Sequence, residues 1–156
     1  MGTHASGGDA ENMARHIVIL GGGTGGTLLA NRLRRALGAD DVISVIDRDG
    51  EHLYQPGLLF VPFGRVKSAR LTRPRAQQLR AGIGFHQSAV DHADIESRRV
   101  YLADGTVLPY DVLVIATGAA LLPGETDGLA EATKRGMAAT FYDRPGAEAL
   151  AGARGR

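Results

Sequence analysis

The sequence predicts an α/β fold built around a parallel sheet, and three of its features support this prediction. Two short runs, His16–Leu20 and Val42–Ile46, are apolar and rich in β-branched residues, as buried parallel strands are. Between them, Gly25–Leu37 is amphipathic at helical spacing, and Gly38 is a typical residue at which a helix ends. Residues 16–47 therefore indicate strand, glycine turn, helix and strand, within the roughly 30 residues that a β-α-β unit requires.

More strands are expected further along the chain. Asp111–Ala116 is a third apolar run and predicts another buried strand of the same sheet. Gly84–Val90 and Arg98–Leu102 also have the composition of strands, and Ala103–Thr106 is typical of a turn. We expect these two segments to form an antiparallel β-meander attached to the main sheet.

The remaining segments are less regular. Leu53–Phe63 is apolar but interrupted by two prolines and a glycine, which predicts a loop or a single helical turn. Arg75–Ala81 predicts a short helix. Beyond Pro123 we expect a glycine-rich loop that lasts until Arg144–Ala151 begins another helix.

The composition is that of a globular domain and excludes several classes of protein. The chain has 156 residues, of which 44% are hydrophobic and 22% charged. Its net charge of +1 gives no indication of nucleic-acid binding. The absence of cysteine excludes disulfides and thiolate metal ligands and suits a cytoplasmic location. No apolar run approaches the roughly 18–20 residues of a membrane span, and no metal site is predicted, because the histidines lack metal-site spacing.

The strongest functional signal is the glycine-rich segment between the first strand and the helix. Its residues are Gly21, Gly22, Gly23, Thr24, Gly25 and Gly26, and they match the pattern Gly-x-Gly-x-x-Gly. In this pattern the first glycine permits a tight turn, the second lets the backbone approach a diphosphate, and the third lets the helix pack closely on the strand. The helix N-terminus then favours the anionic diphosphate of a dinucleotide. The alternative is a glycine loop without a ligand.

An acidic residue follows the glycines at the distance that this site requires. Asp47 ends the second strand about 20 residues after the glycines, where a carboxylate can accept hydrogen bonds from a ribose 2′-hydroxyl. Its charge would repel a 2′-phosphate and so disfavours NADP, although the adjacent Arg48 weakens that exclusion. The alternative is a polar turn residue at the end of a strand.

The third strand ends in three small or hydroxyl residues, which are Ala116, Thr117 and Gly118. In open α/β sheets, ligands bind beyond the carboxyl ends of the strands, and small residues there let the backbone pass close to a cofactor. We therefore include this segment in the predicted site.

A basic stretch without acids lies between Glu51 and Asp91. Its cations include Arg65, Lys67, Arg70, Arg73, Arg75 and Arg80. We interpret the stretch as a solvated face. The alternative is a basic rim that docks on an anionic membrane or partner.

Taken together, these segments resemble the pyridine nucleotide–disulfide oxidoreductase-like flavoproteins. The most similar branch comprises sulfide:quinone oxidoreductase and the flavoprotein subunit of flavocytochrome c sulfide dehydrogenase, with type II NADH dehydrogenase as a relative. The resemblance extends over residues 15–150. The segments that carry it are His16–Gly26, Val45–Asp47, Tyr54–Pro56, Asp104–Gly105 and Tyr110–Gly118.

The resemblance implies an FAD-dependent oxidoreductase with the adenosine half of FAD on this unit. The glycines would hold the diphosphate and Asp47 the ribose, with Arg48 beside it. Val90 would contact the adenine through its backbone, and Pro56 would approach the isoalloxazine. The segment Ala116–Gly118 would border the cofactor. NAD is the alternative cofactor.

The resemblance also implies a reaction and its partners. Family members pass electrons from sulfide or NADH through the flavin to a quinone or cytochrome at a membrane surface. We therefore expect a quinone or a membrane surface as further partners, and a cytoplasmic protein, with attachment to the inner face of the membrane as a further option.

The expected boundaries are a disordered extension over residues 1–14, an incomplete FAD-binding Rossmann-type domain over 15–122, and a linker with the start of a second nucleotide-binding domain over 123–156. The chain is thus expected to be truncated before that second domain and to be catalytically incomplete alone. Self-association into a homo-oligomer or a separate C-terminal chain as partner is expected. Two alternatives stay open, a module that binds NAD or FAD without turnover and an inactive fragment.

Overall fold

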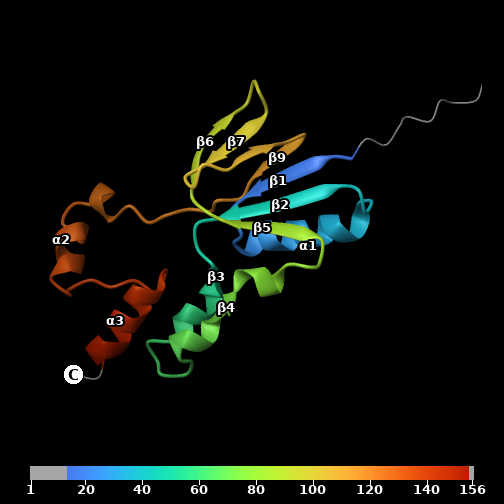
Figure 1. The fold of residues 1–156 in the computed structure, drawn as a ribbon. Coiled ribbons are helices and arrows are strands. Elements are labelled where there is room, and N and C mark those ends of the chain that lie inside the picture. The colour runs from blue at the N-terminus through green and yellow to red at the C-terminus, as the bar shows by residue number, and fades with distance from the viewer. Residues whose placement is uncertain (1–13, 155–156) are drawn as a thin grey trace, which may run out of the picture.

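A parallel four-stranded sheet lies at the centre of the computed structural model, which describes residues 14–154 (Figure 1). Its strands lie in the order β5 (Ile83–Gln87), β2 (Val42–Asp47), β1 (His16–Leu20) and β9 (Val112–Ile115). All neighbouring strands pair in parallel, so their carboxyl ends share one edge of the sheet. The predicted α/β class and the first two predicted strands are confirmed.

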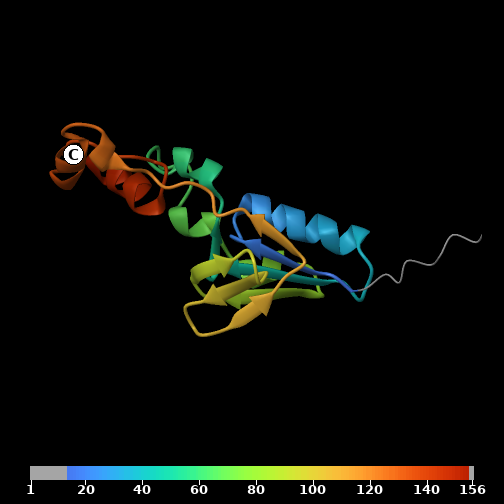
Figure 2. The same ribbon diagram turned by 90° about the horizontal axis from the view of Figure 1, so that it is seen from above.

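The sheet is covered on both faces. Helix α1 (Thr24–Ala36) packs on one face and an antiparallel meander on the other, as Figure 2 shows from above. Side chains alternate between the faces of a strand, so Ile17 and Ile19 of β1 pack with Ala30 of α1. Val18 and Leu20 point the other way, into a second core under the meander.

The meander consists of β6 (Val90–Asp94), β7 (Arg99–Leu102) and β8 (Val107–Pro109). It confirms the predicted type of structure but corrects one of its strands. Gly84–Val90 is not a single meander strand, because Ile83–Gln87 pairs in parallel with β2 and the meander begins at Val90. That parallel pairing joins segments far apart in the sequence, so local composition could not reveal it.

The third predicted strand is in the predicted sheet but is not buried. β9 pairs with β1 at the edge of the sheet, and Val112 and Ile115 are exposed, the latter by 73%. The apolar run at Asp111–Ala116 predicts a buried strand, and this part of the prediction is wrong for Val112 and Ile115. Composition alone does not tell whether another strand lies alongside.

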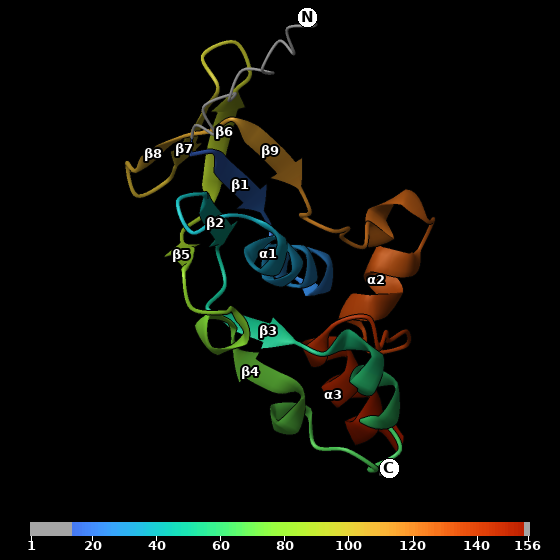
Figure 3. The ribbon, with the colours of Figure 1, turned by 90° about the vertical axis from the view of Figure 1, so that its right-hand side faces the viewer.

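A second, smaller layer lies beyond α1 (Figure 3). It contains the antiparallel pair β3 (Glu51–Leu53) and β4 (Thr72–Pro74), which was not predicted. Three short 3₁₀ helices connect to this pair, at Gln55–Phe60, Ser68–Leu71 and Arg75–Gln78. The predicted single turn within Leu53–Phe63 and the predicted short helix at Arg75–Ala81 therefore exist as 3₁₀ helices.

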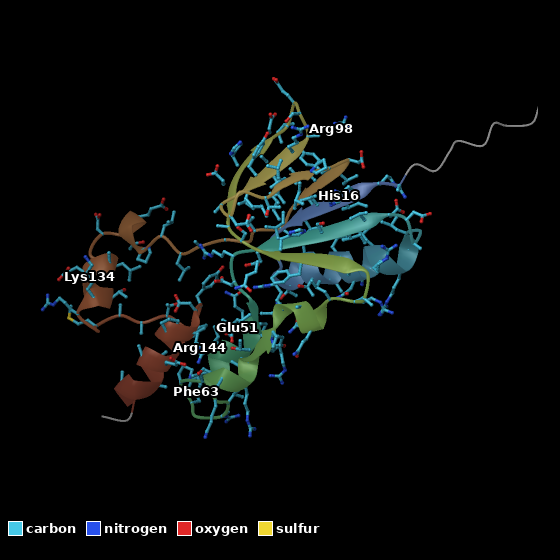
Figure 4. All side chains as sticks on the ribbon, in the orientation of Figure 1. His16, Glu51, Phe63, Arg98, Lys134 and Arg144 are labelled. Atoms are coloured by element: carbon cyan, nitrogen blue, oxygen red, sulfur yellow. The ribbon has the colours of Figure 1, made fainter. Side chains whose placement is uncertain are left out.

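The C-terminal segment extends away from the sheet and returns to the smaller layer. After a 3₁₀ turn at Pro123–Glu125 it forms α2 (Leu129–Lys134), which was not predicted, and α3 (Arg144–Arg154), which was. Ala147 of α3 packs with Leu58, Val61 and Leu71 in a third small core. Figure 4 shows Arg144 at the start of α3 near Glu51 of β3.

Two expectations concern the whole chain. The disordered extension expected over residues 1–14 lies outside the described residues, apart from Ala14. Within residues 14–154, no helix has the length and apolar character needed to cross a bilayer.

Candidate functional site

The glycine-rich segment forms the turn between β1 and α1, at the carboxyl edge of the sheet. Gly21 has a φ of +97°, and a Cβ added there would overlap the carbonyl group of Ala116, just beyond β9. A Cβ added to Gly26 would overlap the carbonyl oxygen of Gly21. These two positions therefore require glycine for the protein's own turn and for the close approach of α1 to β1.

Gly23 and Gly25 differ from these two. A Cβ added to either would meet no atom of the described chain within 4 Å, so internal packing does not require glycine there. Gly23 is the N-cap of α1, none of the described side chains caps it, and the first turn of α1 contains no acidic residue. The first N–H groups of α1 have no partner within the helix, and such groups beside open space suit an anionic diphosphate.

The Asp47 carboxylate lies next to this turn. Its Oδ2 accepts a hydrogen bond from the Gly22 N–H at 2.7 Å, and its Oδ1 accepts one from the Asp49 N–H at 3.0 Å. The side chain of Asp47 is 16% exposed, whereas that of Arg48 points into solvent, with its Nε 3.6 Å from an Asp49 oxygen.

Arg75 is the residue that sequence reasoning missed. The sequence predicts a solvated cation of the basic stretch at this position, which is wrong, because the side chain is buried and lies behind the glycine turn. Its Nη2 lies 3.4 Å from Asp47 Oδ2, and its Nη1 donates to the carbonyl oxygen of Gly22. No signal within the sequence separates Arg75 from its exposed neighbours, because burial here depends on contacts with residues some 25 and 50 positions away.

The other predicted residues lie around the same edge or further off. Ala116 and Thr117 pass directly beside Gly21, and Gly118 follows with a φ of +76°. Val90 begins β6 and packs against the core beneath the meander.

Pro56 and Thr24 come together at a hollow of about 680 Å³, which the sequence did not predict as a unit. Its lining residues are Thr24, Gln55, Pro56, Leu59, Leu121, Thr140, Phe141 and Tyr142. The Gln55 amide donates to the carbonyl of Tyr142 at 3.0 Å, which joins the segment after β3 to the C-terminal segment. The hollow is therefore lined mostly by apolar side chains and opens next to the start of α1.

The fold and this edge define an α/β protein of the FAD/NAD-binding Rossmann type. The family model for pyridine nucleotide-disulphide oxidoreductase matches residues 15–143, and the chain belongs to this family. The resemblance seen in the sequence is thereby confirmed. Proteins of this family bind FAD.

Relatives with known activities fall into two groups. The chain is 28% identical over 115 residues to the mitochondrial sulfide:quinone oxidoreductase of Mus musculus. The aligned segment covers 74% of this chain and 25% of that protein. The chain is 34% identical over 116 residues to the type II NADH:quinone oxidoreductase Ndh of Mycobacterium tuberculosis, covering 70% and 24% respectively. This chain therefore spans about a quarter of the length of these relatives.

Among solved structures, the sulfide:quinone oxidoreductase of the hyperthermophilic bacterium Aquifex aeolicus is similar over 91% of this chain and 32% of that chain. The TM-score is 0.77 and the sequence identity 25%. NDH2 from Plasmodium falciparum, solved in complex with NADH, is similar over 75% of this chain and 25% of that chain, with a TM-score of 0.60 and 21% identity. This second likeness concerns the fold alone.

Proposed function

We propose that this chain is the FAD-binding part of a flavin-dependent oxidoreductase and holds the adenosine diphosphate half of FAD at the carboxyl edge of its main sheet. The observation that carries the proposal is the open space at Gly23 and Gly25, at the uncapped start of α1 and beside Asp47. Packing explains glycine at the neighbouring positions of the turn but not at these two.

In this proposal the backbone N–H groups of Gly23–Gly26 bind the diphosphate, and the Asp47 carboxylate accepts hydrogen bonds from the adenosine ribose. Asp47 has the capacity to do so, because each carboxylate oxygen has two lone pairs and one close backbone donor. Arg48, exposed beside it, would face the outer side of the ribose, and Val90 would approach the adenine through its backbone.

The flavin end would lie toward the hollow beside Thr24. Its apolar wall suits an aromatic ring system, and Pro56 is part of that wall. Ala116, Thr117 and Gly118 would border the cofactor between the two ends. NAD is the alternative ligand, because it shares the adenosine diphosphate half with FAD.

When bound, the flavin supplies the redox chemistry, while residues of this chain bind and orient it. By analogy with the named relatives, the proposed donor is sulfide or NADH and the proposed acceptor a quinone or cytochrome. Residues 15–122 would form the FAD domain, and residues 123–156 a linker and the beginning of a second nucleotide-binding domain.

A quinone acceptor would require this reaction to take place at a membrane surface. Exposed Phe60, near the cations Arg65 and Lys67, supports contact with anionic lipid. Co-sedimentation with anionic but not with neutral vesicles is the expected result, and equal sedimentation with both would contradict it.

The central proposal is tested by nucleotide titration of the 156-residue chain. FAD is expected to bind, with quenching of its fluorescence, and ADP-ribose is expected to compete. FMN is expected to bind far more weakly, because it lacks the adenosine half. Preferential binding of NAD would favour a non-flavin module, and the absence of all binding would favour an inactive fragment.

A matched pair of variants localises the binding. Gly23→Val fills the open space at the start of α1, whereas Gly124→Val fills similarly open space in the distant 3₁₀ turn. The first is expected to abolish FAD binding and the second to leave it unchanged, with both chains folded by circular dichroism. Equal FAD affinity in the two variants would place the cofactor elsewhere.

A further inference from the structure

Arg75 is a charged side chain enclosed by protein, which is unusual enough to require an explanation. It belongs to a stretch rich in cations, but Arg70, Arg73 and Arg80 are exposed and Arg75 is buried. Burying a guanidinium is costly unless it is paired and its N–H groups are satisfied. The partners of Arg75 therefore indicate what the side chain is for.

These partners are mostly backbone carbonyls from two different segments. Nε donates to Asp49 O at 3.0 Å and Nη2 to Glu51 O at 2.6 Å, both in the segment that leaves β2. Nη1 donates to Gly22 O, in the glycine turn. The guanidinium thus ties the glycine turn to the segment that follows Asp47, with Asp47 Oδ2 3.4 Å from Nη2.

The peptide groups on both sides of Gly22 are held by this arrangement. The Gly22 N–H donates to Asp47, and the Gly22 carbonyl accepts from Arg75 and from the Thr27 hydroxyl at 2.9 Å. His52 Nδ1 lies 3.4 Å from the same oxygen. The Gly22 carbonyl belongs to the peptide that carries the Gly23 N–H, so these contacts orient the first amide at the open start of α1.

The requirement for glycine at position 22 has the same origin. A Cβ added there would lie 2.5 Å from Cδ of Arg75, in the middle of the side chain, whereas one added to Gly23 would meet none of the described atoms within 4 Å. The turn is therefore packed against Arg75 on one side and open on the other.

We propose that Arg75 is a positioning residue, whose guanidinium holds the Gly22 peptide and the Asp47 carboxylate in the geometry that binds the diphosphate and ribose of a nucleotide. This inference rests on the proposed function. Arg75 acts from behind the turn and does not contact the ligand. Its charge also offsets that of Asp47 beside a site for an anion, and its planar fork matches carbonyl acceptors that an ammonium group cannot span together.

The test compares Arg75→Lys with Arg73→Lys, a change at an exposed position in β4 whose side chain donates to the carbonyls of Arg70 and Thr72. We expect Arg75→Lys to weaken binding of ADP-ribose by about tenfold or more, because it keeps the charge but loses the fork. Arg73→Lys is expected to bind as the unaltered chain does. Full affinity in Arg75→Lys would overturn the proposal, since charge alone would then suffice.

A second variant covers the case in which Arg75→Lys fails to fold. Gly22→Ala keeps Arg75 but forces it away from the turn, and a misplaced turn is expected to weaken ADP-ribose binding by up to about a hundredfold. Full affinity in Gly22→Ala would overturn the proposal. Where Arg75→Ala folds, it frees the space that the new methyl group needs, so its effect on affinity and that of Gly22→Ala are expected to be non-additive. Additive effects would show that the two residues act independently.

Failure of the proposed function is distinguishable from failure of this inference. If the unaltered chain bound no nucleotide, the proposed function would fail. Amide hydrogen exchange would still measure whether Arg75 holds the glycine turn in place. Exchange at the Gly22 amide, which donates to Asp47, is expected to speed up in Arg75→Lys and not in Arg73→Lys. Unchanged exchange at this amide would exclude Arg75 as the residue that orders the turn.

Discussion

The two ends of the main sheet each carry an arginine–aspartate pair, and the two pairs differ in the groups to which they hydrogen-bond. At the amino end, Asp41 Oδ1 accepts from the backbone N–H of Arg15 at 3.0 Å and from its Nε at 3.2 Å. Asp41 Oδ2 accepts from the Gly38 N–H at 3.1 Å. These bonds, those to Arg15 foremost, hold the pKa of the Asp41 carboxyl below its usual value. The carboxylate thereby closes the junction between α1, β1 and β2.

At the carboxyl end, the arginine of the pair donates mainly to backbone carbonyls. Arg75 donates hydrogen bonds to the carbonyls of Gly22, Asp49 and Glu51. Asp47 accepts hydrogen bonds from two backbone N–H groups beside the open start of α1. The amino-end pair thus consolidates a junction, whereas the carboxyl-end pair shapes a turn with free space in front of it. An ion pair by itself does not mark a binding site, and the proposed site rests instead on the open space at Gly23 and Gly25.

The largest expected effect tests whether the glycines of the carboxyl-end turn differ in packing, with Gly26 in close contact and Gly25 in open space. Gly26→Ala places a methyl group against the Gly21 carbonyl, and separation of α1 from β1 is expected to lower the free energy of unfolding by about 1–3 kcal/mol. Gly25→Ala is the control, expected to be neutral or stabilising by up to about 1 kcal/mol, because it adds helix propensity in open space. Urea denaturation measures both. Equal stabilities would mean that Gly26 is not in contact with the turn.

A smaller effect tests whether the amino-end pair is only structural. Asp41→Asn removes the charge that Arg15 contacts, so we expect a lower thermal midpoint and unchanged affinity for FAD. Asp40→Asn, at the exposed neighbouring position, is the control and is expected to leave the midpoint unchanged. A fall in FAD affinity for Asp41→Asn at temperatures where the chain is fully folded would show that the amino-end pair also affects binding, which would contradict a purely structural role.

The smallest expected effect is a pH dependence at the same amino end. Burial lowers the pKa of His16 below its ordinary 6.5, although the Asp111 carboxylate opposes this and His86 adds to it. Because the folded chain then binds the proton less readily than the unfolded chain, stability is expected to rise as the pH increases through about 6.5 and to fall below it. His16→Gln should remove this part of the slope in denaturation curves taken between about pH 5 and 8. An unchanged slope would assign the dependence to other groups.

Acid lowers stability again in a second and lower range. The depressed pKa of Asp41 means that its contribution is present above the ordinary 3.8 and is lost as the pH falls through the lower, folded-state value. The pKa values of Asp94, Asp104 and Glu148 are lowered as well, chiefly by hydrogen bonds to their carboxylates, so the comparison with Asp41→Asn is needed to isolate the contribution of Asp41 in this range.

The amino-acid sequence by itself determined the β-α-β unit, the glycine turn and the acid after β2. These depend on residues close together in the chain, where apolar spacing and the freedom of glycine dictate the conformation. The pattern also indicated the family, and the match over residues 15–143 confirmed it.

Only the tertiary structure decided which glycines belong to packing and which face open space, and that β5 joins the main sheet while β9 is its exposed edge. It also took Arg75 out of an apparently solvated stretch and placed it behind the turn. The physical reason is the same in each case. Parallel pairing and burial depend on contacts between segments tens of residues apart, and a charged side chain is buried only where folding brings its acceptors together.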